Sequence, residues 1–434
     1  MSPFDDTLRQ EIELIYQDLT LSDGTLHKDA RQHLQVLADP AFADLDQPAW
    51  LRSLNRFSTL PGFPVLDMPY RSSKLFDALY ETGDELGFAA GKRYVSAAVC
   101  ACARRAESAT ASRKDRPRRV AEALCRLASA WTAFMLWPFE EKAREERHRY
   151  WALWNGGKPH YADYLEHLLQ RDDYHCFMSG SLHVRAPLEL FPGPGEDGVH
   201  GDVLRAKYIF HPPSALRADG MREDDEVITW DILQHYCAPI RLDSVQWTEG
   251  IPPEARNALM LAGSPGEAFT TFTTFGWCLH PTQVPNQYDV VVHERYCAGG
   301  QPVASPVTFE DHSAKYRTPP ASAPATDESS GGGPPRAECS VDVNLPSADL
   351  LRVHAALAGA CHLSGAAVLF DAIFYGMGEL KGQRAPGASR GAFWEAVVVR
   401  EGRDLCLPVR DDDSDSDSDY VPDDDDDEDD DDDD

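Results

Sequence analysis

The most informative part of this sequence begins with the run RDDYHCFMSG at residues 171–180. The run follows the apolar end of a helical pattern, opens on a charged turn and continues as a short strand that Ser179 and Gly180 end. Later pieces are LRAKYIFHPP at 204–213, NALML at 257–261, GEAFTTF at 266–272 and YDVVV at 288–292. Their order predicts a strand, a loop, a second strand, a turn that carries Asn257, a helix and closing strands.

This order of elements resembles the HNH nuclease domain, in the version that many fungal proteins carry. In that family an Arg-Asp-x-Tyr-x-Cys-x-x-[Thr/Ser]-Gly motif precedes an Ala-His-Ile-like segment, an Asn-x-x-x-Leu turn and a helix written roughly His-x-x-Phe-Asp. The matching positions of this chain are Arg171, Asp172, Tyr174, Cys176, Ser179, Gly180, Asn257, Leu261, Phe269 and Phe272. Family-like helices at 91–95 (GKRYV) and 345–354 (LPSADLLRVH) extend the resemblance over about residues 70–380.

The resemblance implies a reaction, the metal-dependent hydrolysis of phosphodiester bonds in nucleic acids. Such hydrolysis needs a histidine as general base and a divalent metal that stabilises charge on the phosphate. Tyr208 occupies the position of the family's first histidine, with His211 as the only imidazole nearby, and Gly266 occupies the position of the metal-binding histidine. Glycine offers no side chain to a metal, and the family's Phe-Asp becomes Phe269-Thr270.

Two of the three signature positions are therefore substituted, and the resemblance leaves open whether the chain is an enzyme. The favoured interpretation is an HNH-nuclease-like protein in which hydrolysis is weakened or lost, with Tyr208, His211 and Asn257 at the catalytic positions. The resemblance assigns no metal ligand to a residue present here, and a divalent metal is expected only if the nuclease is active. His280 is a weak candidate ligand, because it lies fourteen positions beyond Gly266.

Two other functions stay open. An active endonuclease would use His211 as its base and would take Asp219, Asp224 or His280 as metal ligands. A non-enzymatic protein would engage basic nuclear partners, such as histones or ribosomal proteins, through its acidic C-terminal residues. Asn257 does not separate these functions, because an asparagine at a turn bonds backbone groups in each of them.

Charge is distributed unevenly along the 434 residues. The formal net charge is −31, and residues 411–434 contribute 18 acidic side chains and no basic ones, which leaves −13 for the rest. These totals do not indicate the basic face that is typical of a DNA-binding protein, although DNA is the partner that the resemblance implies. One basic cluster, SRKDRPRR at 112–119, suits a nuclear import signal, a phosphate-contacting loop or an ordinary solvated loop.

Composition divides the chain into five parts, and the expected fold class is α+β. A mainly helical module at 1–150 precedes an HNH-like ββα-metal domain at 168–295. A disordered linker rich in Pro, Ser and Gly at 300–338, a helical segment at 340–405 and a disordered acidic tail at 411–434 follow.

The cysteines and the hydropathy pattern bear on location. The ten cysteines are scattered without any Cys-x-x-Cys pair, which predicts reduced, buried thiols and no zinc knot. No apolar run is long enough to cross a membrane, and the first residues are acidic and polar. We therefore expect an intracellular protein, nuclear or cytoplasmic, that does not bind membranes.

Overall fold

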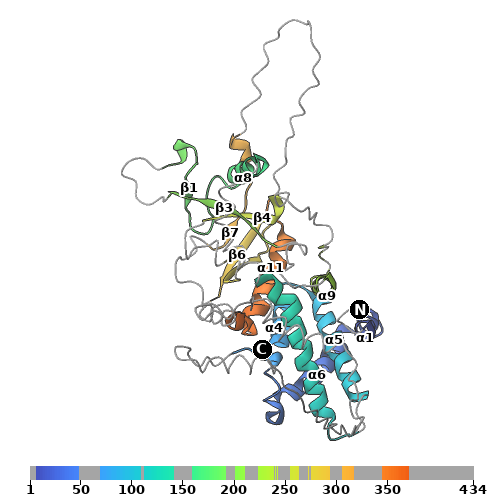
Figure 1. Ribbon diagram of the computed structural model, residues 1–434. Coiled ribbons are helices and arrows are strands. Elements are labelled where there is room, and N and C mark those ends of the chain that lie inside the picture. The colour runs from blue at the N-terminus through green and yellow to red at the C-terminus, as the bar shows by residue number, and fades with distance from the viewer. Residues whose placement is uncertain are drawn as a thin grey trace, which may run out of the picture.

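The computed structural model describes residues 6–47, 69–108, 112–140, 159–191, 201–210, 223–238, 240, 242, 255–262, 272, 275–293, 305–316 and 345–370. Helices gather in one half of the molecule and strands in the other, which makes this an α+β fold (Figure 1). One hydrophobic core runs through both halves. The acidic tail at 411–434 lies outside the described residues.

The helical half is built around one alanine-rich helix, α5 (Ala89–Ser108). Its neighbours are α1 (Asp6–Gln17), α2 (Asp23–Leu34), α4 (Ser72–Glu85) and α6 (Arg116–Trp131), and two short 3-10 turns, η1 (Gln35–Ala38) and η2 (Pro40–Phe42), follow α2. Every side chain from Tyr94 to Ala103 is buried, because α5 packs against each of these four helices. Small alanine side chains let these helices approach closely.

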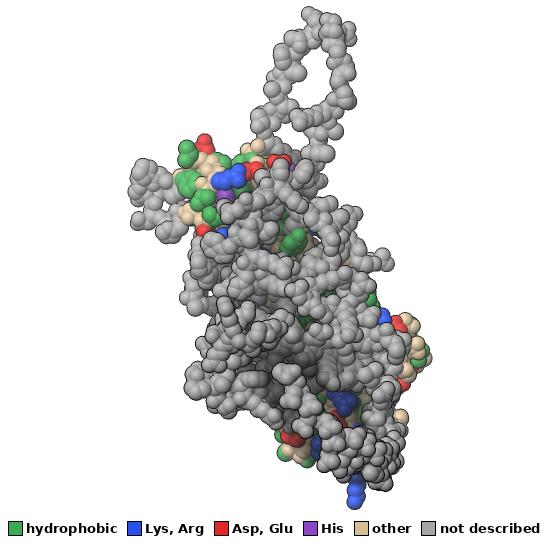
Figure 2. Space-filling view, in the orientation of Figure 1, with side chains coloured by type: hydrophobic (Ala, Val, Ile, Leu, Met, Phe, Trp, Pro, Cys, Tyr) green, Lys and Arg blue, Asp and Glu red, His purple; other side chains and the backbone are tan. Residues whose placement is uncertain are grey.

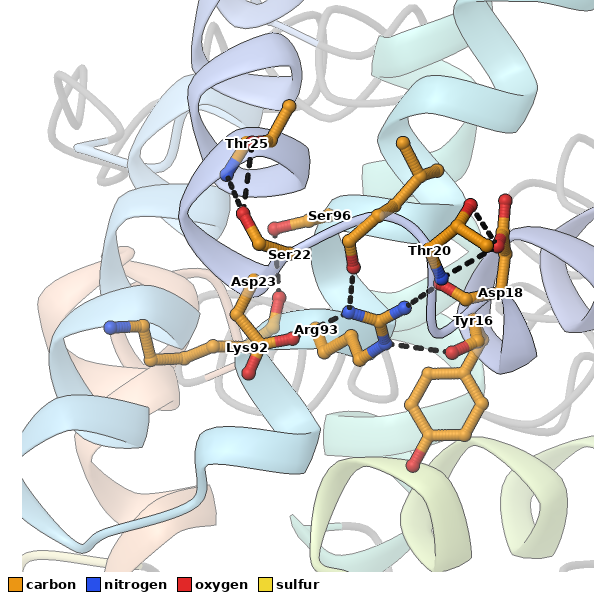
Figure 3. Close-up of polar contacts among 10 residues, drawn as sticks. Tyr16, Asp18, Thr20, Ser22, Asp23, Thr25, Lys92, Arg93 and Ser96 are labelled. Atoms are coloured by element: carbon orange, nitrogen blue, oxygen red, sulfur yellow. Dashed lines mark hydrogen bonds and ion pairs between the residues drawn. The ribbon is translucent and has the colours of Figure 1, made fainter.

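Arg93 of α5 fixes the connection between α1 and α2. Its guanidinium donates hydrogen bonds to the backbone oxygens of Tyr16 at 2.7 Å, Asp18 at 2.6 Å and Leu21 at 2.9 Å, and it also pairs with Asp23 (Figure 3). Backbone carbonyls at the end of a helix have no partner within the helix, and Arg93 supplies one. One side chain of the GKRYV segment thus has a structural role.

The strand half contains three small sheets. A parallel pair joins β1 (Leu182–His183) to β2 (Gly201–Asp202), and an antiparallel pair joins β3 (Leu204–Tyr208) to β4 (Ala258–Ala262). The third sheet has the antiparallel order β5 (Trp277–Pro281), β6 (Gln287–Val292) and β7 (Val307–Thr308). Helix α8 (Pro159–Arg171) and the 3-10 turns η4 (Leu188–Leu190), η7 (Ala255–Asn257) and η8 (Ser313–Tyr316) complete this half.

Helix α9 (Glu223–Tyr236) connects the two halves. It lies between β3 and β4 in sequence, yet it packs against α5. The Tyr236 hydroxyl lies 2.8 Å from the Thr82 hydroxyl of α4, and Arg9 of α1 pairs with Asp231 at 2.7 Å. A Cβ atom on Gly91 would lie only 2.2 Å from the backbone oxygen of Tyr236, so the two helices touch where that glycine stands.

Helix α11 (Ala348–Leu363) also belongs to both halves. Ser347 caps it by accepting a hydrogen bond from the Leu350 amide at 3.4 Å. The helix packs against α4 on one side and against β5 on another (Figure 1). Its residues from Val353 to Cys361 are buried, so this segment is part of the common core.

The prediction of a disordered linker across 300–338 is wrong for residues 305–316. Strand β7 pairs with β6, and the Phe309 ring lies edge-on to Phe177 with centroids 5.0 Å apart. The His312 amide donates to the backbone oxygen of Arg171 at 3.0 Å. Averaged composition concealed these apolar residues, which find partners in distant parts of the chain.

None of the helices in the described ranges has the length and apolar character that crossing a membrane requires.

Candidate functional site

The side chain of Asn257 fixes the backbone that follows Tyr208. Asn257 Nδ2 donates to the backbone oxygen of Phe210 at 2.8 Å, and Asn257 Oδ1 accepts from the Phe210 amide at 3.0 Å. The Ile209 amide also donates to the backbone oxygen of Asn257 at 3.0 Å. Tyr208 pairs with Ala258 at the end of the β3–β4 ladder, so these hydrogen bonds continue the ladder beyond the strand.

Asn257 lies in a turn, as predicted, but residues 258–261 of the predicted Asn-x-x-x-Leu turn form a strand. Asn257 ends the 3-10 turn η7, and residues 258–262 form strand β4, whose five side chains are all buried. A run of five apolar residues is stabilised more by pairing with β3 inside the core than by a surface turn. Asn257 therefore stands before a strand. Gly266, where the following helix was expected to begin, lies outside the described residues.

Arg171 holds the turn that carries Asn257. Its side chain is fully buried, and Nη1 donates to the backbone oxygen of Ala255 at 2.7 Å. Nη2 donates to the backbone oxygen of Ala258 at 3.0 Å. The Asp172 carboxylate balances the buried charge through hydrogen bonds of 2.6 Å from Nε and 2.8 Å from Nη2. Because both carbonyls flank Asn257, Arg171 positions that residue from the end of α8.

The rest of the RDDYHCFMSG run forms a tight turn. Asp173 and Tyr174 have φ angles of 53° and 60°, in the left-handed region that favours glycine. Tyr316 donates its hydroxyl to Asp173 Oδ1 at 2.6 Å, and Lys315 Nζ donates to Oδ2 at 3.0 Å. Burial opposes ionisation of Asp173, but the hydrogen bonds from Tyr316 and Lys315 lower its pKa overall.

Two further residues of that run have structural partners. Burial and the nearby Glu166 carboxylate, which accepts the Tyr174 hydroxyl proton in a hydrogen bond, raise the pKa of Tyr174 to about 12. Gly180 has a φ of 69° and donates its amide to the backbone oxygen of Cys176 at 2.8 Å. Cys176 itself is fully buried. The run thus builds a turn and positions neighbouring elements.

A small cavity lies beside Tyr208. It measures about 20 Å³, which is room for one water molecule, and its lining is mainly aromatic. The lining residues are Phe139, Tyr208, Ile209, Phe210, Phe272, Phe275, His354 and Leu357. Segments from both halves therefore meet at the end of β3.

His354 of α11 also lines this cavity, although the sequence analysis gave it no place among the site residues. It is 4% exposed, its Nε2 lies 3.2 Å from the backbone oxygen of Phe272, and its ring stacks on the Phe272 ring with centroids 4.0 Å apart. The Phe275 ring lies 5.1 Å away. The sequence signal that could have identified this histidine is the family-like segment LPSADLLRVH, which ends on it.

Of the remaining predicted site residues, His280 does not line this cavity. His280 lies on β5 in the three-stranded sheet, opposite Asp289, and burial lowers its pKa. Asp224 lies in α9, and His211 and Asp219 lie outside the described residues. Within the described ranges, no three His, Cys, Asp or Glu side chains come together in a way that could hold a metal ion.

Comparison of the chain with protein-family models, with curated proteins and with solved structures found no match.

Proposed function

We propose that this chain is derived from an HNH-type nuclease and that its metal-dependent hydrolysis of nucleic acids is weakened or lost. The observation that carries the proposal is the pair of hydrogen bonds between the Asn257 amide and the Phe210 backbone, next to Tyr208. In the family that the sequence resembles, an asparagine fixes the loop that carries the base. The proposal is therefore supported by Asn257, which still fixes this loop, next to Tyr208, which replaces the family's base.

The chemistry at Tyr208 supports loss of activity. A general base works best when its pKa lies near the operating pH, and histidine meets this condition. Phenols generally keep their proton up to about pH 10, so they accept a proton from water poorly at neutral pH. A tyrosine in place of the histidine would thus slow the activation of water.

The surroundings of Tyr208 also support the loss of nuclease activity. Divalent cations such as Mg²⁺ take oxygen ligands at about 2.0–2.1 Å and usually retain several waters. The cavity beside Tyr208 has a volume of about 20 Å³ and the rings of Phe210, Phe272 and Phe275 line it. This space suits packed aromatic rings better than a hydrated cation with a phosphate.

Cleavage of plasmid DNA by the purified chain in Mg²⁺, Mn²⁺ and Ni²⁺ tests the proposal. We expect no cleavage above the level of a buffer control, and no change with His211→Ala. Robust cleavage that His211→Ala abolishes would contradict the proposal and would favour an active endonuclease with His211 as its base.

Rebuilding the family's residues is a second test. Tyr208→His combined with Gly266→His restores both imidazoles, and we expect calorimetry to detect metal binding by the double variant only. Each single variant and Tyr208→Phe serve as controls, because metal and base act as a unit. Tight metal binding by the unmodified chain would show that other residues form a site, and the proposal would be withdrawn.

A further inference from the structure

A basic surface lies at the tip of the helical half, where α6 begins. This basic tip consists of Arg113, Lys114, Arg116, Arg118 and Arg119, and all five side chains are exposed. Figure 2 shows Lys and Arg side chains at the lower end of the molecule, where α5 and α6 meet in Figure 1. The chain as a whole carries a net charge of −31, so the local excess of positive charge opposes the general trend.

Several cations elsewhere in the described residues form ion pairs with carboxylates. The paired residues are Arg9, Arg31, Lys92, Arg93, Arg171, Arg185, Lys315 and Arg352. In the basic tip, Arg118 pairs with Glu122 one turn along α6 at 3.0 Å. Arg113, Lys114 and Arg116 form no ion pair with any described residue. Of the five cations, Arg113, Lys114 and Arg116 therefore keep their charge available for a partner.

We propose that the basic tip binds the acidic tail of the same chain, residues 411–434. The tail supplies 18 carboxylates and no cation, which makes it the complement of a surface with five cations in seven positions. Opposite charges attract over about 10 Å at an ionic strength of 0.1 M, so several such pairs would add. The contact does not depend on whether nuclease activity remains.

The length of chain between the two segments permits this contact. Phe370, the last described residue, contacts the Trp137 ring with centroids 5.3 Å apart, and Trp137 follows α6 at the end far from the basic tip. At about 1.5 Å per residue, the helical stretch from Arg116 to Trp137 spans roughly 30 Å. The 40 residues from 371 to 410 can span at most about 140 Å when extended. Tethering also gives the tail a millimolar-range effective concentration.

The tail is favoured over a nucleic acid as the partner. Both are polyanions, but a nucleic acid approaching from solution meets a chain whose net charge is strongly negative. The tail is covalently attached, so its binding needs no association step. Nucleic-acid binding is nevertheless a defined outcome of the experiment below.

Zero-length carbodiimide cross-linking of the full chain tests the proposal, because it joins a lysine amine to a carboxylate in contact with it. Lys114 is the lysine of the basic tip, and exposed Lys28 on α2 is the internal reference. At about 10 mM salt we expect Lys114 to link to the tail at least roughly fivefold more than Lys28 does. At about 1 M salt, where the Debye length is about 3 Å, the two yields should become equal.

Matched variants locate the contact. Changing Arg113, Arg116, Arg118 and Arg119 to Gln keeps Lys114 as the reporter, and we expect its links to the tail to fall at least roughly fivefold. The control changes four exposed cations elsewhere, Arg9, Lys74, Arg126 and Arg185, to Gln and should leave the yield unchanged. All of these positions are exposed, and the ion pairs of Arg9, Arg118 and Arg185 that the changes remove are surface pairs worth about 0–1 kcal/mol each, so the fold should tolerate the changes.

Three results would overturn the proposal. Equal links from Lys114 and Lys28 at low salt would mean that the tail has no preferred surface. In a mixture of heavy-nitrogen-labelled and unlabelled chains, links mainly between different chains would make the partner a second copy. Absence of tail links, together with duplex DNA binding that the four substitutions in the basic tip abolish, would make the basic tip a nucleic-acid surface.

Discussion

The Asn257 side chain behaves as a strand partner for Phe210. Its amide donates to the Phe210 oxygen at 2.8 Å and accepts from the Phe210 nitrogen at 3.0 Å, so both backbone groups of one buried residue are satisfied by one side chain. This pairing holds the backbone that follows Tyr208, and Arg171 in turn holds the carbonyls on either side of Asn257. A chain of buried polar contacts thus connects α8 to the end of β3.

Replacing Asn257 with Ala should destabilise the protein by about 2–4 kcal/mol. The change removes two hydrogen bonds and leaves the buried N–H and C=O of Phe210 without partners, and each buried group left unpaired costs about 1–3 kcal/mol. Urea unfolding followed by far-ultraviolet circular dichroism measures the loss. The exposed amide Gln283→Ala is the control and should change stability by less than about 0.5 kcal/mol. If Asn257→Ala lowered the unfolding free energy by less than about 1 kcal/mol, the two hydrogen bonds to Phe210 would not have the stabilising role given to them here.

Gly91→Ala should weaken the contact between α5 and α9. Its added Cβ would lie 2.2 Å from the Tyr236 oxygen, a backbone atom that cannot turn aside as a flexible side chain could. We expect a loss of about 1–3 kcal/mol in unfolding free energy, the usual range for overpacking. Gly24→Ala in α2 is the matched control, because nothing lies within 4 Å of its added Cβ. That control should be neutral or stabilising by up to about 1 kcal/mol. Equal effects of both substitutions would show that α5 and α9 can separate at little cost.

Arg93→Lys should loosen the connection between α1 and α2 without changing net charge. Lysine has one ammonium group in place of the planar fork that contacts the oxygens of Tyr16, Asp18 and Leu21. We expect a loss of about 1–3 kcal/mol and faster amide hydrogen exchange over residues 16–23. Arg126→Lys, at an exposed position, should leave the exchange rates unchanged. Unaltered exchange in Arg93→Lys would mean that other contacts hold this connection.

His293 should make stability depend on pH. Burial, with a smaller contribution from His280, lowers the pKa of His293 to about 4 from the ordinary value of 6.5. The unfolded chain therefore binds a proton between about pH 6.5 and pH 4 that the folded chain does not. The contribution of His293 to the free energy of unfolding is fully present above pH 6.5. It is lost as the pH falls, by at most about 1.4 kcal/mol per pH unit.

The His293→Phe variant isolates that share. A phenyl ring can still stack on His362, whose ring lies parallel to that of His293 with centroids 4.1 Å apart, but it cannot take up a proton. We expect the stability of the unmodified chain to fall more steeply than that of the variant in urea unfolding at pH 7.5, 6.5, 5.5 and 4.5. Parallel curves would show that His293 titrates normally in the folded chain.

Local patterns predicted several elements of this fold because their causes are local. Apolar side chains at helical spacing from Val120 onward form the buried face of α6, and Ser347 caps α11 by accepting a hydrogen bond from the Leu350 amide. Helices usually end before a proline, yet residues 137–140, which include Pro138, are helical. A π-helical turn, η3 (Thr132–Leu136), precedes Pro138, and such a turn changes the hydrogen-bond register so that a proline is accommodated.

The sequence by itself determined the local features: the residues that cap helices, the apolar faces of the elements and an asparagine whose amide can bond backbone groups. Only the tertiary structure decided which distant groups these meet. Both backbone groups of Phe210 bond to the Asn257 side chain. Helix α9 packs on α5, although β3 and β4 flank it in the sequence, and His354 lines the same cavity as Tyr208. Periodicity specifies which face of an element is apolar, but many partner faces could cover it. Shape, burial and the pairing of buried polar groups across the whole chain select the partner.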